Sequence, residues 1–85
     1  MSMPTILLIH GWRLYFYANE GNEPPHIHVR KGDAEAKYWL HIKEFDIQEA
    51  YAYKMKKSDR RKIRKIIFEN LEHLVAEYNA MHGGE

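Results

Sequence analysis

The sequence predicts an α+β fold in which an antiparallel meander of about four strands packs, in two layers, on one long C-terminal helix plus a short helix before it. Three observations lead to this prediction. The chain has 85 residues, which suits a single domain over residues 1–85. Residues 3–41 form a strand half, in which apolar and polar residues alternate in short segments. Residues 46–81 form a helical half, in which apolar residues recur at helical spacing.

The strand half is expected to contain four short strands. They cover residues 5–9, 12–18, 26–31 and 34–41. His10 and Gly11 make the first turn, and Gly32 and Asp33 make the last one. Residues 19–25 are rich in glycine, asparagine and proline, so we expect a loop between the second and third strands.

The helical half is expected to contain two helices. Asp46, followed three residues later by Glu49, fits a capping box at the start of a short helix that reaches about Lys56. Ser58 is a second candidate N-cap. Apolar residues recur every three or four positions after it, which predicts a long amphipathic helix to about Ala80.

The composition excludes several classes of protein. There is no cysteine, which excludes a disulfide scaffold, a thiolate zinc site and a cysteine nucleophile. The longest aliphatic run, residues 6–9, is far shorter than the ~20 residues of a membrane span. No charged and then apolar leader is present. We therefore expect a cytoplasmic protein without a membrane partner.

The net charge of +1 conceals a cationic block in residues 54–65. This block has eight lysines and arginines against Asp59 alone, whereas residues 66–85 have four glutamates and no lysine or arginine. Such a block favours binding of an anion such as the phosphate backbone of RNA, or it is the solvated face of a surface helix. The candidate nucleic-acid contacts in the block are Lys57, Arg60, Arg61 and Arg64.

A second group of candidate residues is expected on the sheet face that the helices leave open. Because side chains alternate across a strand, apolar residues such as Leu14 and Val29 should face the helices. The open face should then carry Arg13, Tyr15, Tyr17, His26, His28, Arg30, Lys37 and Trp39. Rings stack on bases and cations hold phosphates, so this face suits RNA. It also suits ordinary cross-strand packing, or docking of a partner protein or a second copy as a homodimer.

The most distinctive stretch is residues 24–29, in which two prolines precede His26 and His28. Alternation places both imidazoles and Arg30 on one face of one strand. In RNA cleavage, the two histidines would act as general base and general acid, and Arg30 would stabilise the charge on phosphorus without any cofactor. These catalytic roles require the three side chains to project into accessible space.

Two other interpretations of the histidine pair stay open. Paired imidazoles also bind zinc, iron or nickel when a carboxylate completes the set, and Asp33 follows at a loosely suitable spacing. Alternatively, the imidazoles are structural and bond to the preceding loop or to tyrosine hydroxyls. The histidine-triad type of nucleotide hydrolase is set aside, because Arg30 stands where its third histidine belongs.

Several stretches of the sequence resemble a known family. They are residues 3–6 (MPTI), 16–17 (FY), 19–20 (NE), 23–29 (EPPHIHV) and 36–40 (AKYWL). These residues resemble the small bacterial family called domain of unknown function 4160, closely over residues 3–40 and only as a helical pattern over residues 44–78. Residues 53–57 depart from the family pattern, in which an apolar turn with glycine is expected, so we treat the cationic block as particular to this chain.

The resemblance also carries expectations about partners. Members of this family look like one half of a two-gene toxin–antitoxin-type module, beside a small protein of another family of unknown function. This implies a small protein partner encoded by an adjacent gene, and it implies nothing firm about catalysis. The leading hypothesis is therefore an RNA-associated component of such a module, with His26 and His28 as a cleavage site. The alternatives are a non-enzymatic interaction module that uses the open face, and a histidine metal site.

Overall fold

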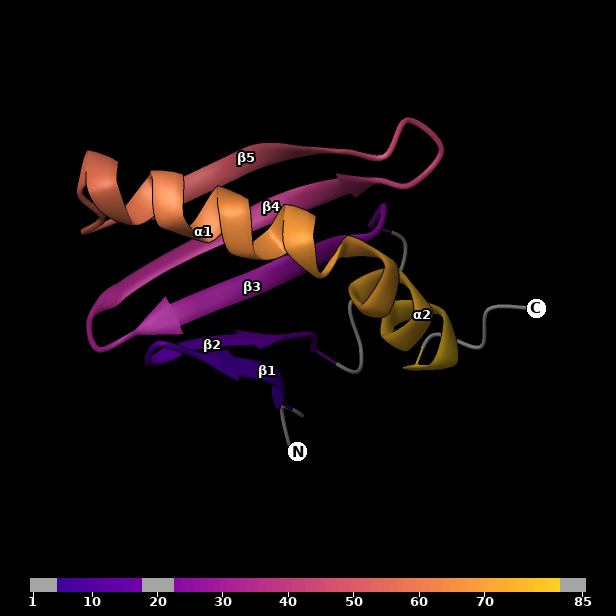
Figure 1. The fold of residues 1–85 in the computed structure, drawn as a ribbon, viewed down its shortest axis with the longest axis horizontal. Coiled ribbons are helices and arrows are strands. Elements are labelled where there is room, and N and C mark those ends of the chain that lie inside the picture. Colours follow the sequence, from indigo (N-terminus) through magenta and orange to yellow (C-terminus); the bar gives the residue numbers. More distant parts are fainter. Residues whose placement is uncertain (1–4, 18–22, 82–85) are drawn as a thin grey trace.

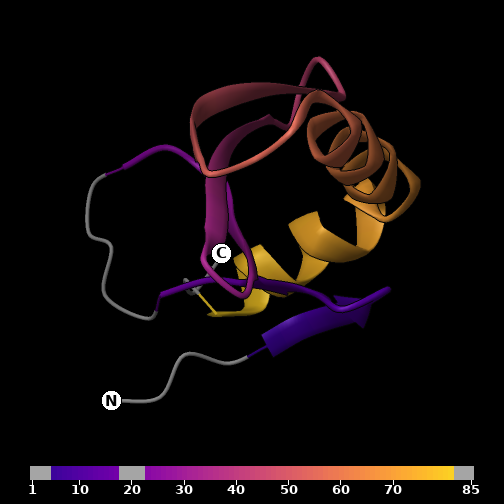
Figure 2. The same cartoon turned by 90° about the vertical axis from the view of Figure 1, so that its left-hand side faces the viewer.

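Five antiparallel strands in one sheet and two helices make up the computed structural model, which describes residues 5–17 and 23–81 (Figure 1). The strands are β1 (Thr5–Ile9), β2 (Trp12–Tyr15), β3 (His26–Lys31), β4 (Ala34–His41) and β5 (Asp46–Tyr53), and the helices are α1 (Lys57–Glu69) and α2 (Leu71–Met81). The strands lie in sequence order. The predicted α+β meander is confirmed, with five strands instead of about four. In Figure 2 both helices lie on the same side of the curved sheet.

The first, third and fourth strands have the predicted bounds, and the second is shorter. β2 ends at Tyr15, and Phe16 and Tyr17 continue beyond it. The expected start of the strand half at residues 3 and 4, the end of the second strand at residue 18 and most of the expected loop, residues 19–22, lie outside the described residues.

The predicted short helix from Asp46 to Lys56 is wrong, because residues 46–53 form β5. This strand pairs with β4, for example through Ile47 opposite Leu40. The Asp46 carboxylate accepts a hydrogen bond from the N–H of Ile47 at 2.8 Å and caps no helix. Without β5, the edge of β4 would leave its backbone donors and acceptors unpaired, which is costly in a partly buried sheet. The helical half therefore begins at residue 57 and not at residue 46.

The predicted long helix is two helices that meet at Asn70. The Asn70 side-chain amide donates a hydrogen bond to the carbonyl oxygen of Ile66 at 2.8 Å, and its backbone N–H lies 3.2 Å from the same oxygen. Asparagine competes in this way with regular helical hydrogen bonding, so the chain changes direction there. The first helix also begins one residue before the expected cap Ser58: the Lys56 N–H donates to the Asp59 carboxylate at 3.3 Å.

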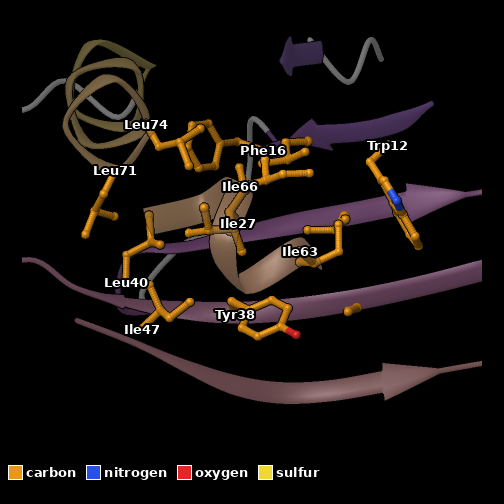
Figure 3. Packing of buried hydrophobic residues seen from close by; sticks show 14 residues of the cluster. Trp12, Phe16, Ile27, Tyr38, Leu40, Ile47, Ile63, Ile66, Leu71 and Leu74 are labelled. Atoms are coloured by element: carbon orange, nitrogen blue, oxygen red, sulfur yellow. The ribbon is translucent and has the colours of Figure 1, made fainter. Parts of the chain in front are cut away.

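The apolar core lies between the inner sheet face and the helices (Figure 3). The strands and the residue after β2 contribute the predicted Leu14 and Val29, together with Trp12, Phe16, Ile27, Ala36, Tyr38, Leu40 and Ile47. The helices contribute Ile63, Ile66, Ile67, Leu71 and Leu74. Neither of the two described helices combines the length and apolar character needed to cross a bilayer.

The stability of the fold should fall between pH 10 and pH 12 because of Tyr38. Burial, followed by the charge of Glu49, raises the pKa of Tyr38 from 10.0 to about 12, and the Tyr38 hydroxyl donates a hydrogen bond to Glu49 at 3.2 Å. Because this pKa is higher in the folded state than in the unfolded state, its stabilising contribution is complete below pH 10 and is lost as the pH rises to 12.

The loss amounts to at most about 1.4 kcal/mol per pH unit. Urea denaturation between pH 10 and pH 12 measures this loss in the free energy of unfolding. The variant Tyr38→Phe has no phenol at this position, so its free energy of unfolding should fall less over the same range. Equal declines in the two proteins would contradict the assignment to Tyr38.

Candidate functional site

Three rows of side chains cross the sheet on the side away from the helices. In the middle row, Tyr51 is paired with Lys37, Lys37 with His28, and His28 with Tyr15. Residues directly opposite one another in antiparallel strands share a face. The flanking rows are Tyr53, Glu35, Arg30 and Arg13 on one side and Gln48, Trp39 and His26 on the other. These three rows, together with Tyr17, form the surface that we term the open face.

The prediction that His26, His28 and their aromatic neighbours share one face is correct, and their rings are in contact. The Tyr15 and His28 rings are stacked with centroids 5.4 Å apart. His26 meets His28 edge to face at 5.1 Å and Trp39 at 5.6 Å. Tyr17 stands nearly perpendicular to His28 at 4.6 Å. The open face is therefore built on a continuous cluster of five rings from β2, β3, β4 and the residues after β2.

The two histidines are not accessible, contrary to the expectation from sequence. His26 is 1% exposed and His28 is 6% exposed, although both lie on the side of the sheet away from the helices. Neighbouring rings pack against both imidazoles. The His26 Nδ1 lies 2.8 Å from the carbonyl oxygen of Pro24, which can only accept, so Nδ1 carries the proton and donates. This favours the structural interpretation of His26, and the catalytic roles of His26, His28 and Arg30 stay predictions.

Tyr15 supports the histidines and is poorly suited to proton transfer at neutral pH. Burial, and then a hydrogen bond with Tyr17, raises the pKa of Tyr15 to about 12. The guanidinium of Arg13 lies 4.6 Å from the centre of the Tyr15 ring, in a cation–π contact. The Tyr15 hydroxyl therefore stays protonated, and the residue serves the open face as a ring.

The other two cations of the open face are paired with carboxylates. The Lys37 ammonium lies 2.6 Å from the Glu23 carboxylate and 4.4 Å from the centre of the Trp39 ring. Arg30 and Glu35 form a longer ion pair at 3.9 Å, and the Arg30 side chain is about half exposed. The positive charge of the open face is therefore smaller than the count of lysines and arginines predicts.

Sequence reasoning missed Tyr51 and Tyr53, which are 44% and 58% exposed on the open face. They lie on the segment predicted as helix. The register between β4 and β5 shifts at a β-bulge, which leaves Ala50 without a partner on β4. Gln48 lies on the open face, so strict alternation would turn Tyr51 and Tyr53 toward the core. The extra residue reverses this and turns both tyrosines outward. The alternation of Tyr51, Ala52 and Tyr53 was the only local signal of a strand.

The four candidate contacts in the cationic block do not lie on the open face, so the predicted nucleic-acid contacts fall on two surfaces, although the ammonium of Lys54 lies 5.5 Å from the centre of the Tyr53 ring. Lys57, Arg60, Arg61 and Arg64 belong to α1, which packs on the inner side of the sheet (Figures 1 and 2). Arg60 pairs with Glu49 at 3.3 Å. Arg64 lies 5.9 Å from the centre of the Phe68 ring. The fold therefore separates these four residues from Arg13, Tyr15, Tyr17, Lys37 and Trp39.

The described residues offer no support for the metal-site alternative. Within residues 5–17 and 23–81, no three histidine, aspartate or glutamate side chains come together in a way that could hold a metal ion. Asp33, the candidate third ligand, is exposed in the turn after β3, at the opposite end of that strand from His26.

A family model for a domain of unknown function (DUF4160) matches residues 11–79. The match runs from the turn after β1 into α2, well beyond the residues 3–40 over which the resemblance was close. No curated protein and no solved structure matches the chain. These comparisons carry no information about activity, so the function has to be argued from the site.

Removal of either buried imidazole should destabilise the fold. His26→Ala and His28→Ala each leave a cavity among packed rings, and we expect a loss of about 1–3 kcal/mol in the free energy of unfolding. Arg30→Ala is the matched control on the same strand and face, and it should change stability by less than about 0.5 kcal/mol because its side chain is half exposed. Urea denaturation makes the comparison, and losses below about 0.5 kcal/mol in both histidine variants would exclude a structural role for the histidines.

Proposed function

Because the chain belongs to the family of the domain of unknown function DUF4160, we propose its function from its open face, as binding of single-stranded RNA. Bases would stack on the exposed rings, and the guanidinium groups would hold phosphates. The proposal assigns the contacts with bases to the open face and not to α1.

The exposed pair Tyr51 and Tyr53 carries this proposal. Their rings lie on a sheet face next to guanidinium groups: Tyr53, Arg30 and Arg13 share one cross-strand row. Neighbouring rows are two residues, about 6.6 Å, apart along each strand, so they can engage successive nucleotides. A base stacked on an aromatic ring contributes about 1–3 kcal/mol without regard to sequence. Large exposed rings beside cations are therefore a better match to flexible single strands than to a duplex.

The charge pairs described above favour a second candidate function, a protein-interaction module. Glu23 and Glu35 offset Lys37 and Arg30, and tyrosine, tryptophan and arginine are the residues that dominate protein interfaces. The partner would be the small protein encoded by an adjacent gene, or a second copy of the chain. Co-purification of that gene product, lost on Trp39→Ala, would favour this candidate over RNA.

Single-stranded RNA should bind at low salt, with an affinity that falls as salt rises because phosphate contacts release counterions. Tyr51→Ala and Tyr53→Ala should each weaken binding by about tenfold. Phe45→Gly is the control, since it removes an equally exposed ring that lies outside the open face. Fluorescence anisotropy with a labelled oligonucleotide measures all four proteins. Absence of binding at low salt, or binding that keeps its strength in both tyrosine variants, would overturn the proposal.

Cleavage of the bound RNA and the toxin–antitoxin setting extend the proposal further. If His26 and His28 cleave RNA, expression of the chain without its neighbouring gene should slow growth, and incubated RNA should be shortened. His28→Gln should abolish both effects. Val29→Ala, on the same strand but in the core, controls for lost stability. The catalytic hypothesis would be wrong if the wild-type chain and His28→Gln gave the same growth and the same RNA length.

A further inference from the structure

An apolar groove lies between the turn after β4 and helix α2, apart from the open face. Its walls are Ile42 and Phe45 from the turn and Leu71, Val75 and Ala76 from α2, the exposed Glu72 and Asn79 line its rim, and its volume is about 380 Å³. A second hollow of about 260 Å³ shares Phe45, Leu71 and Glu72 with the groove and extends to Phe68. Phe45 therefore stands between two adjoining hollows, which we term together the Phe45 groove.

The backbone holds the Phe45 ring in place at a conformational cost. Phe45 has φ +53°, in the left-handed region that bulky side chains rarely adopt, and its ring is 53% exposed. Its N–H donates to the carbonyl oxygen of Ile42 at 3.2 Å and closes the turn. Glycine or asparagine would fit this position with less strain. An exposed aromatic ring at a strained turn, over an apolar hollow, points to a role in binding.

The surroundings of the groove are negatively charged. Glu72 lines both hollows, Glu69 and His73 line the second, and no lysine or arginine lines either one. Glu44 is exposed in the same turn as Phe45, as is Lys43, which lines neither hollow. Helix α1 ends at Glu69 and helix α2 begins at Leu71, so the opposite ends of the two helix dipoles meet beside the groove and offset each other, and the negative charge comes from the carboxylates.

Only part of this charge is compensated within the chain. Lys65 pairs with Glu69 at 3.7 Å, one turn earlier on α1. Among the described residues Glu72 has no ion pair within 4.0 Å. A ligand that presents cations at the rim and apolar side chains to the floor would satisfy both features of the groove.

We propose that the Phe45 groove docks a cationic amphipathic helix of a partner protein. Leucine-like side chains at helical spacing would pack on Phe45, Leu71 and Val75, and lysines or arginines would pair with Glu72 and Glu69, as in helix-in-groove recognition. A second copy is a poor occupant. The cationic helix of such a copy, α1, already buries its apolar residues Ile63, Ile66 and Ile67 in its own core. The groove shares no residue with the open face, so this proposal does not depend on RNA binding.

Synthetic peptides test the proposal directly. The purified chain should bind an amphipathic peptide with leucine and lysine at helical spacing at least about tenfold more tightly than the same peptide with glutamate for lysine, or than a scrambled leucine–lysine peptide. Phe45→Gly should weaken binding by about tenfold without lowering stability, because glycine fits the positive φ. Glu72→Lys should have a similar effect on binding. Glu77→Lys, on α2 but outside the groove, should leave binding unchanged.

Three results would overturn the proposal. The first is equal affinity for the three peptides, and the second is affinity that Phe45→Gly leaves intact. The third is a homodimer in sedimentation that Phe45→Gly converts to a monomer, because the groove would then be filled by a second copy. RNA binding measured on the same variants separates this proposal from that for the open face, since Phe45→Gly should weaken only peptide binding and Tyr53→Ala only RNA binding.

Discussion

The packing of both helices on one face of a five-stranded sheet is the constraint on which the other features depend. Burial of apolar area between Ile27, Tyr38 and the isoleucines of α1 is the main source of stability in a domain of this size. Both helices pack on the same face of the sheet and leave the second face without helical cover. The second face must therefore be stabilised by its own side chains, and here it is stabilised by rings.

The ring cluster of the open face explains why a histidine pair can be distinctive in sequence and yet buried. His26 and His28 fill the space between Tyr15, Tyr17 and Trp39, and they make contacts with rings on either side. Such packing fixes the rings, which reduces the conformational entropy lost when a ligand binds. In this arrangement the imidazoles support the rings of the open face, whereas a role as acid and base would require both imidazoles to become accessible.

The fold gives the chain separate surfaces of different chemistry. The open face is aromatic with nearly balanced charge, α1 turns its cations away from it, and the Phe45 groove is apolar with an acidic rim. Because no residue is shared between the open face and the groove, a nucleic acid and a partner helix could bind at the same time. A protein of 85 residues could thus connect two different ligands.

The sequence by itself determined the strands at residues 26–31 and 34–41 and the face to which each of their side chains points. The alternation of apolar and polar residues is a local pattern, and apolar side chains can be buried only on the face that the helices cover. The sequence did not determine the secondary structure of residues 46–53, because the spacing of Ile47, Ala50 and Tyr51 also fits a helix. Only pairing with β4 decides between the two, since the hydrogen bonds of a strand come from a partner elsewhere in the chain. The bulge at Ala50 and the cover over His26 are likewise tertiary, because each is created by side chains and backbone of neighbouring strands that no local pattern records.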